Sequence, residues 1–235
     1  MSTTLAPTPV ARAADTRTIR RVVVAVLLPL GPLAVAAIRG YLPYFHATDS
    51  AETVAKAAAE PGRMSAVLWF GVLAMVALVP SVLGAARLAQ RRAPVLSLLA
   101  VGLLVPSFVM LFFGSGDLTL SAVAGAGIDP ATAVQVYDTA GASGPAMLSM
   151  SVFVIGHIVG TVLLGAALWR ARVVPVWAAI AVIVSQPLHA VAFVAVSSQP
   201  LDVMAWGLTA LGLGVAGLRV LRTPNDEWDL PAVAR

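Results

Sequence analysis

Apolar residues are gathered into six long runs separated by shorter polar segments. Each run approaches or exceeds the roughly 20 residues that an α-helix needs to cross a bilayer. None of the runs contains Asp, Glu, Lys or Arg. The pattern predicts an all-α fold, a polytopic membrane protein built as a six-helix transmembrane bundle, with spans at residues 22–38, 64–86, 95–113, 147–169, 174–196 and 203–218.

Two connections between these runs each predict a short extracytoplasmic helix. Asp49 followed three residues later by Glu52 is a capping box, and Pro61 ends the segment that it opens. Asp129 followed by Pro130 is an N-cap with proline at the first helical position. We expect these helices either to cover the bundle or to form a lid over an outward-facing cavity.

Composition supports the membrane class. Hydrophobic residues make up 59% of the chain and charged residues 11%, against about 45–50% and about 25% in soluble domains. The absence of cysteine excludes disulfides, thiolate metal sites and thiol catalysis. Arginine far outnumbers lysine, and alanine, valine and glycine are abundant, which indicates a GC-rich bacterial genome and hence a bacterial plasma membrane.

The charge distribution predicts the orientation, because short cytoplasmic loops are enriched in Lys and Arg. With the N-terminus inside, the net charge is +8 on the inner side and −4 on the outer side, which agrees with the total of +4. Both termini are therefore expected in the cytoplasm, with disordered tails at 1–18 and 223–235 around a transmembrane domain at 19–222. The interfacial preference of tryptophan fits this topology, with Trp69 and Trp206 near the outer boundary and Trp169 and Trp177 near the inner one.

Two alternatives concern individual helices. The first run also resembles the core of a signal peptide, because it follows Arg20 and Arg21 and ends in small residues. Gly156 and Gly160 in the fourth run have the small-xxx-small spacing that lets backbones approach closely. Internal packing is the expected use of this spacing, and a homodimer through the fourth or sixth helix is the alternative.

Two histidines lie at membrane depth on helices that are adjacent in the sequence. At 1.5 Å per residue, His157 and His189 fall about 15 Å and about 10 Å below the outer boundary. The short turn between their helices makes the helices antiparallel neighbours, so the two rings can approach. Residues on the same helix faces extend this candidate ligand-binding cluster to Thr161, Ser185 and Gln186.

Three hypotheses explain the cluster. It can be a structural network across helices, which includes the Ile183 carbonyl that Pro187 leaves free. It can be a polar pocket for a small hydrophobic or amphipathic ligand. It can also ligate a b-type haem through His157 and His189. A zinc site has less support, because two histidines fall short of the usual three or four ligands unless His46 folds inward.

Other chemistry has little support. Ion-coupled transport normally uses a membrane-embedded carboxylate or lysine, and the outer acids, Asp202 among them, are assigned to loops and helix ends. Asp117 is expected to form a rim ion pair with Arg39. No phosphate-binding loop, nucleophile elbow or zinc-protease helix is present, and no basic patch with interleaved aromatic residues indicates nucleic acid. Nothing in the chain predicts an enzyme.

The segment GTVLLGAALWRARVVPVWAAIAVI, residues 160–183, resembles the corresponding portion of uncharacterised six-helix bacterial integral membrane proteins. The shared features are an inner turn with arginines, a V-P-x-W start of the next helix, and a long loop between the third and fourth helices. That family has no assigned activity, so the resemblance implies a fold and no site residue. We expect a non-enzymatic protein that binds a small hydrophobic or amphipathic molecule or a partner protein in the outer half of the bundle. The alternative is a haem-binding redox subunit.

Overall fold

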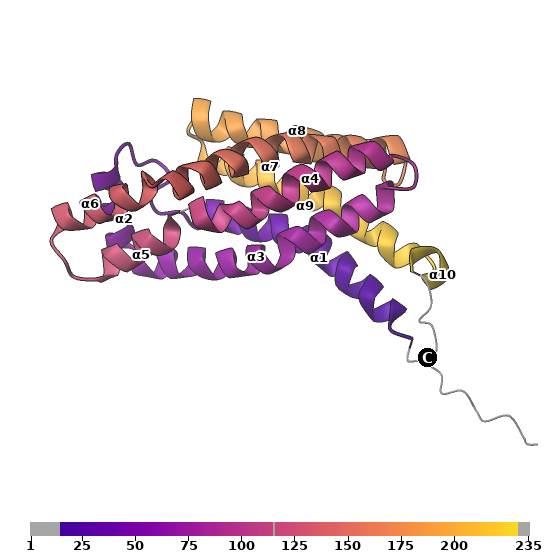
Figure 1. Ribbon diagram of the computed structural model, residues 1–235, viewed down its shortest axis with the longest axis horizontal. Coiled ribbons are helices and arrows are strands. Elements are labelled where there is room, and N and C mark those ends of the chain that lie inside the picture. Colours follow the sequence, from indigo (N-terminus) through magenta and orange to yellow (C-terminus); the bar gives the residue numbers. More distant parts are fainter. Residues whose placement is uncertain (1–14, 115, 230–235) are drawn as a thin grey trace, which may run out of the picture.

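The computed structural model describes residues 15–114 and 116–229. The tail residues 1–14 and 230–235 lie outside the described part of the chain. Six long helices run side by side (Figure 1) and confirm the predicted spans. They are α1 (Arg17–Tyr41), α3 (Pro61–Ala89), α4 (Pro94–Gly114), α7 (Gly144–Ala171), α8 (Val176–Ala190) with its π-helical extension η1 (Val191–Ala195), and α9 (Gln199–Arg222).

The six helices close into a ring. Helix α1 packs between α9 and α3, α4 packs between α3 and α7, and α8 packs between α7 and α9. The expected contact of α7 with α8 is therefore present. Because the ring is closed, residues from α1, α7, α8 and α9 can meet in its interior.

Glycines bring the helices close together. A Cβ atom added at Gly156 would lie 2.0 Å from Ser107 Oγ, and one at Gly160 would lie 2.6 Å from Leu104 Cγ, so α7 meets α4 through these positions. On α9, a Cβ atom at Gly217 would lie 2.5 Å from the Ala25 carbonyl oxygen of α1. The small-xxx-small motif thus serves internal packing, and a homodimer would need other surfaces of α7 and α9.

Three short helices form a cap at one end of the bundle, named here the cap end. They are α2 (Ser50–Ala59), α5 (Asp117–Gly125) and α6 (Pro130–Gly141). The predicted caps are present, since Asp49 accepts the Glu52 N–H at 2.7 Å and Asp129 accepts the Thr132 N–H at 3.1 Å. Helix α5 was not predicted, because Gly116 precedes it and no side chain caps its first turn.

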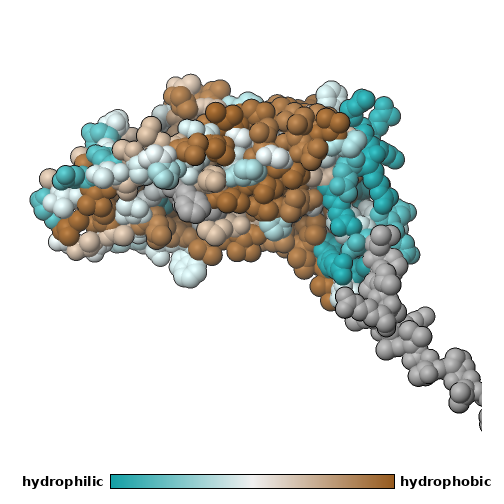
Figure 2. Space-filling model, in the orientation of Figure 1, coloured by the Kyte–Doolittle hydropathy of each residue, from teal (hydrophilic) through white to brown (hydrophobic). Residues whose placement is uncertain are grey.

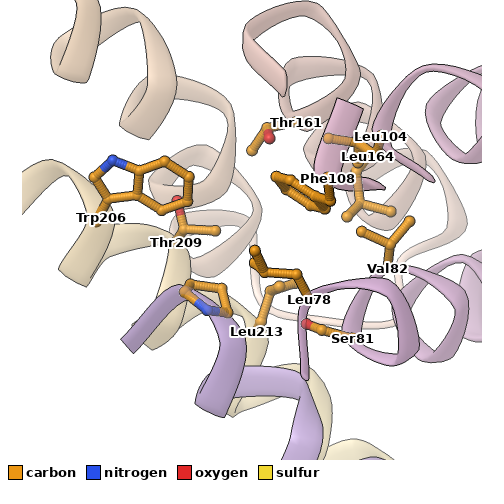
Figure 3. Close-up of a pocket in the computed structure, with 11 residues that line it drawn as sticks. Leu78, Ser81, Val82, Leu104, Phe108, Thr161, Leu164, Trp206, Thr209 and Leu213 are labelled. Carbon is orange, nitrogen blue, oxygen red and sulfur yellow. The ribbon is translucent and has the colours of Figure 1, made fainter. Parts of the chain in front are cut away.

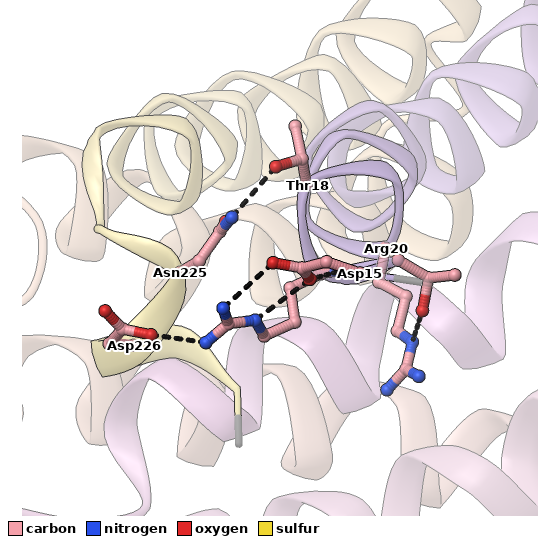
Figure 4. Close-up of polar contacts among 7 residues, drawn as sticks. Asp15, Thr18, Arg20, Asn225 and Asp226 are labelled. Atoms are coloured by element: carbon pink, nitrogen blue, oxygen red, sulfur yellow. Dashed lines mark hydrogen bonds and ion pairs between the residues drawn. The ribbon is translucent and has the colours of Figure 1, made fainter. Parts of the chain in front are cut away.

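The opposite, arginine-rich end holds both ends of the described chain. Here α10 (Asn225–Trp228) corrects the prediction that the segment from 223 onward is a tail without structure. Trp228 is buried and lies 4.9 Å from the Arg87 guanidinium, and Asp226 pairs with Arg17 of α1 (Figure 4). A hydrophilic band marks this end beside the apolar middle of the molecule (Figure 2). Its location in the cytoplasm remains a prediction.

Candidate functional site

The two intramembrane histidines meet inside the ring. Their ring centroids are 5.5 Å apart. The His157 ring stacks on Phe153 at 4.3 Å and lies nearly parallel to Trp206 at 6.0 Å. His189 also approaches Trp206, with centroids 5.6 Å apart. The histidines and Trp206 thus form one aromatic cluster between α7, α8 and α9.

His157 is held in a defined tautomer. Its Nδ1 atom lies 2.6 Å from the Phe153 carbonyl oxygen. Because a carbonyl oxygen only accepts hydrogen bonds, Nδ1 must carry the proton, and the Nε2 atom of the neutral ring is an acceptor. Nε2 is buried and has no hydrogen-bond partner among the described residues. The ring therefore presents an unsatisfied acceptor to the interior.

His189 belongs to a buried charged group. Its Nδ1 atom contacts Asp202 Oδ1, while the Arg39 Nε–H donates to Asp202 Oδ2. Asp202 is fully buried in the first turn of α9, where the helix dipole favours a carboxylate. This position agrees with the expectation that the outer acids lie in loops or at helix ends, but the complete burial of Asp202 was not predicted. The bundle therefore holds a buried carboxylate at the start of its last long apolar helix.

The predicted rim pair of Asp117 with Arg39 is also corrected. Arg39 pairs with Asp202, and the Tyr44 hydroxyl donates to Asp117 instead. Burial raises the pKa of the Tyr44 hydroxyl, and the nearby Asp117 charge raises it further. Asp117 thus helps to hold the segment after α1 against the cap.

Aromatic rings and irregular backbone surround Arg39. Its guanidinium lies 4.5 Å from the centre of the Phe193 ring and 5.1 Å from that of Phe45. Arg39 Nη2 is buried without a partner among the described residues. Phe193 belongs to the π-helix η1, and Ser197 just after it has a φ of 49°. Such backbone departures are concentrated at functional sites.

Two of the three remaining predicted residues, Ser185 and Gln186, form a hydrogen-bond chain with α9. Gln186 Nε2 donates to Thr209 Oγ1 at 3.0 Å, Thr209 donates to Ser185 Oγ at 2.7 Å, and Ser185 donates to the Val182 carbonyl at 2.8 Å. The sequence predicts that this network ends on the Ile183 carbonyl, but Ser185 donates to the Val182 carbonyl instead. Gln186 Oε1 is buried and has no partner among the described residues. This chain of hydrogen bonds adds further buried polar groups next to the histidines, on α8 and α9.

A cavity of about 10 Å³ adjoins this chain, lined by Thr161, Thr209 and Trp206 and, across from them, by apolar residues of α3 and α4 (Figure 3). This volume admits about one water molecule. The space beside the histidines is far smaller than a porphyrin, and the two imidazole centroids are only 5.5 Å apart. The site as folded therefore does not fit a haem.

His46 does not complete a metal site. Its Nδ1 atom lies 3.4 Å from Ser197 Oγ at the cap end. Within residues 15–114 and 116–229, no group of three or more His, Cys, Asp or Glu side chains lies close enough to hold a metal ion. The third zinc ligand that the sequence left open is thus not supplied by His46.

Sequence reasoning missed Arg39, Asp202, Trp206 and Thr209. The spacing of the last three, at i, i+4 and i+7, places them on one face of α9, and this spacing is visible in the sequence. Trp206 had been assigned to the membrane interface, but it is 2% exposed and belongs to the site, whereas Trp69 is exposed as expected. Comparisons of the chain with family models, curated proteins and solved structures found no significant match.

Proposed function

We propose that this membrane protein binds a small amphipathic molecule with a hydroxyl or carboxyl group at the cluster of Arg39, His157, His189, Asp202 and Trp206, named here the buried cluster. The observation that carries the proposal is the set of unsatisfied polar atoms gathered there. Among the described residues, His157 Nε2 and, on the same helix as His189, Gln186 Oε1 have no donor, while Arg39 Nη2 and Trp206 Nε1 have no acceptor.

Unsatisfied groups of this kind are unfavourable inside a membrane protein. Each buried polar group without a hydrogen bond destabilises the fold by about 1–3 kcal/mol, and water is scarce in the hydrocarbon region. Two acceptors and two donors in one region call for a group that can both donate and accept. Hydroxyl and carboxylic acid groups do both, whereas an alkyl chain does neither.

Access to the buried cluster is available at its cap end. The side chains of Arg39 and His189 are 16% and 12% exposed, whereas Asp202 is fully enclosed. Exposed apolar residues of η1, including Phe193 and Val194, border this entrance. The interior cavity accommodates only a water-sized molecule, so a polar head group would enter at Arg39 and leave its alkyl chain against η1. This arrangement favours an amphipathic ligand over a wholly polar one.

The proposal is tested by ligand-induced stabilisation of the purified full-length protein in lipid nanodiscs. The probes are decanoic acid and 1-decanol, with decane as the apolar control. Ligand at 100 times its Kd adds about 2.7 kcal/mol of stability, which corresponds to a rise of about 5–10 °C in Tm for a domain of this size. We expect the acid or the alcohol to raise Tm and decane to leave it unchanged.

His157→Phe is the matched variant, because phenylalanine keeps a ring between Phe153 and Trp206 and removes the Nε2 acceptor. We expect this variant to fold with equal or higher Tm and to lose most of the probe-induced rise. Ser107→Ala removes a buried hydroxyl outside the buried cluster and should keep that rise. The proposal fails if neither probe stabilises the wild type, or if His157→Phe responds as the wild type does. The proposal also fails, in favour of the haem hypothesis, if the purified wild type shows a Soret band that the variants His157→Ala and His189→Ala lose.

A further inference from the structure

Four exposed arginines gather at the arginine-rich end, away from the buried cluster. Arg91 and Arg92 lie in the turn between α3 and α4, and Arg170 and Arg172 lie at the end of α7. The two turns touch, because Arg92 Nη1 donates to the Ala171 carbonyl at 3.2 Å. The guanidinium of Arg92 therefore lies against the backbone of Ala171, the residue between Arg170 and Arg172 in the sequence. These residues are named here the four-arginine patch.

The acidic residues of this end serve a different group of arginines. Among the described residues, the ion pairs at this end join Arg17, Arg20 and Arg87 to carboxylates of Asp15, Asp226 and Asp229. None of the ion pairs found there includes a member of the four-arginine patch. Like charges held close together repel one another unless a counterion is present. The patch is thus suited to an anion supplied from outside the chain.

The backbone at Arg172 is a second, independent observation. Arg172 has a φ of 54°, in the left-handed region, and ends α7 at the position that glycine ordinarily occupies. A non-glycine residue in this region is strained, and such strain recurs at ligand sites. The left-handed residue that ends α7 is thus an arginine, although a glycine at this position would relieve the strain. Folding alone does not require that side chain.

The surroundings of the four-arginine patch indicate a lipid. Trp169 and Trp177 beside it are each 54% exposed, as tryptophans at a head-group boundary are. Exposed apolar residues continue from the patch into the membrane along α4 and α8, with Val95 and Leu98 on the first helix and Ile180 on the second. An anion that binds here would therefore have its charge at the arginines and alkyl chains along the helices.

We propose that the four-arginine patch binds the head group of an anionic phospholipid with two phosphates, cardiolipin. Guanidinium groups pair with phosphate through two parallel hydrogen bonds. Each of the two touching turns offers two arginines, so a head group with two linked phosphates can bind both turns at once. The linkage makes it bind more tightly than two separate phosphates would. Basic pockets between membrane helices at the cytoplasmic side bind head groups of this kind.

Native mass spectrometry of the detergent-purified full-length protein tests the proposal, with cardiolipin, phosphatidylglycerol and phosphatidylcholine as separate probes. We expect cardiolipin to bind most tightly and phosphatidylcholine least. Each arginine near an anionic lipid raises the binding affinity by a factor of roughly five. The double variant Arg170→Gln/Arg172→Gln should therefore weaken cardiolipin binding about 25-fold. Arg219→Gln/Arg222→Gln removes the same charge from exposed positions of α9 at the same end and should change it by less than about threefold.

Arg172→Gly separates lipid binding from folding. Glycine relieves the left-handed strain, so Tm should stay equal or rise while cardiolipin binding weakens about fivefold. The proposal is overturned if the two double variants lose binding equally, if phosphatidylcholine binds as well as cardiolipin, or if Arg172→Gly leaves binding unchanged. Displacement of cardiolipin by inorganic phosphate at millimolar concentration would show a site for the free anion and would also overturn it.

Discussion

Replacing Asp202 with asparagine should destabilise the protein more than replacing its partner Arg39 with glutamine. Asp202 is fully buried, and it joins α9 to Arg39 of α1 and to His189 of α8. Asparagine keeps the size of the side chain and still offers an oxygen to the His189 N–H. The variant Asp202→Asn therefore removes the charge and leaves the neighbouring geometry in place.

The magnitude follows from what each variant leaves behind. Removing one member of a buried ion pair typically destabilises by 3–5 kcal/mol, because the other charge remains without a partner. In Asp202→Asn the guanidinium of Arg39 stays 16% exposed and keeps its contacts with Phe45 and Phe193. These contacts relieve part of the penalty, so we expect about 3 kcal/mol.

Arg39→Gln leaves the Asp202 carboxylate with its contact to His189 Nδ1, and the shorter glutamine amide can still donate a hydrogen bond to it. We therefore expect a smaller loss, about 1–2 kcal/mol. The double variant Arg39→Gln/Asp202→Asn leaves no buried charge, and two amides can hydrogen-bond to each other. Its loss should be smaller than that of Asp202→Asn alone, with a coupling free energy of about 1–3 kcal/mol.

The assay is reversible unfolding in mixed micelles with increasing SDS mole fraction, followed by circular dichroism. Identical slopes for the four proteins would show that the unfolded states are comparable. The Arg39–Asp202 pair is not a stabilising buried pair if Asp202→Asn lowers the free energy of unfolding by less than about 1 kcal/mol. The same holds if the losses of the two single variants simply add in the double variant. Either result would mean that the pair is effectively solvated and contributes as a surface ion pair does.

Two further predictions concern helix packing and the arginine-rich end. Gly217→Ala should destabilise by about 1–3 kcal/mol, because its Cβ would lie 2.5 Å from the Ala25 carbonyl oxygen. Gly207→Ala on the same helix meets no atom within 4 Å, so in the same SDS titration it should be neutral or gain up to about 1 kcal/mol. The hydrogen bond from Arg87 lowers the pKa of Asp229. The charged Asp229 carboxylate therefore stabilises the fold at pH values above the ordinary pKa of an aspartate, and this stabilisation is lost as the pH falls through the lowered pKa. Hydrogen exchange in α10, corrected for intrinsic rates, should rise on acidification and already be raised at neutral pH in Asp229→Asn; equal protection in that variant would contradict the prediction.

The membrane spans could be predicted because hydropathy is a property of each run by itself. The structure extends most of these helices by several residues beyond the apolar runs, as at α1 and α9, because polar residues continue the helix outside the hydrocarbon region. The caps at Asp49 and Asp129 were predictable for a similar local reason, since each is complete within four residues. Helix α10 was missed because its stability depends on contacts with Arg87 and α1, which are distant in the sequence.

The candidate site was only half predictable. His157 and His189 stood out because ionisable residues are rare within apolar runs, and the turn between α7 and α8 is short enough to make their helices neighbours. Asp202 was placed outside the last apolar run, in a loop or at a helix end, because charge was used to define where that run begins. Only the closed ring shows that the first turn of α9 lies against both α8 and the end of α1. A charged residue at the edge of an apolar run is therefore ambiguous until its helix has neighbours.

The path of the chain between His189 and Asp202 links backbone irregularity to the buried charge. Pro187 lies within α8, the π-helix η1 follows, and the left-handed Ser197 reverses the chain into α9. A π-helical turn contains more residues than an α-helical one and so rotates the residues that follow it. This turn brings the Asp202 carboxylate onto the Nδ1 atom of His189 and places Phe193 over Arg39. The irregular segment and the buried charges thus form one unit, and a molecule bound at Arg39 would directly contact η1 through Phe193.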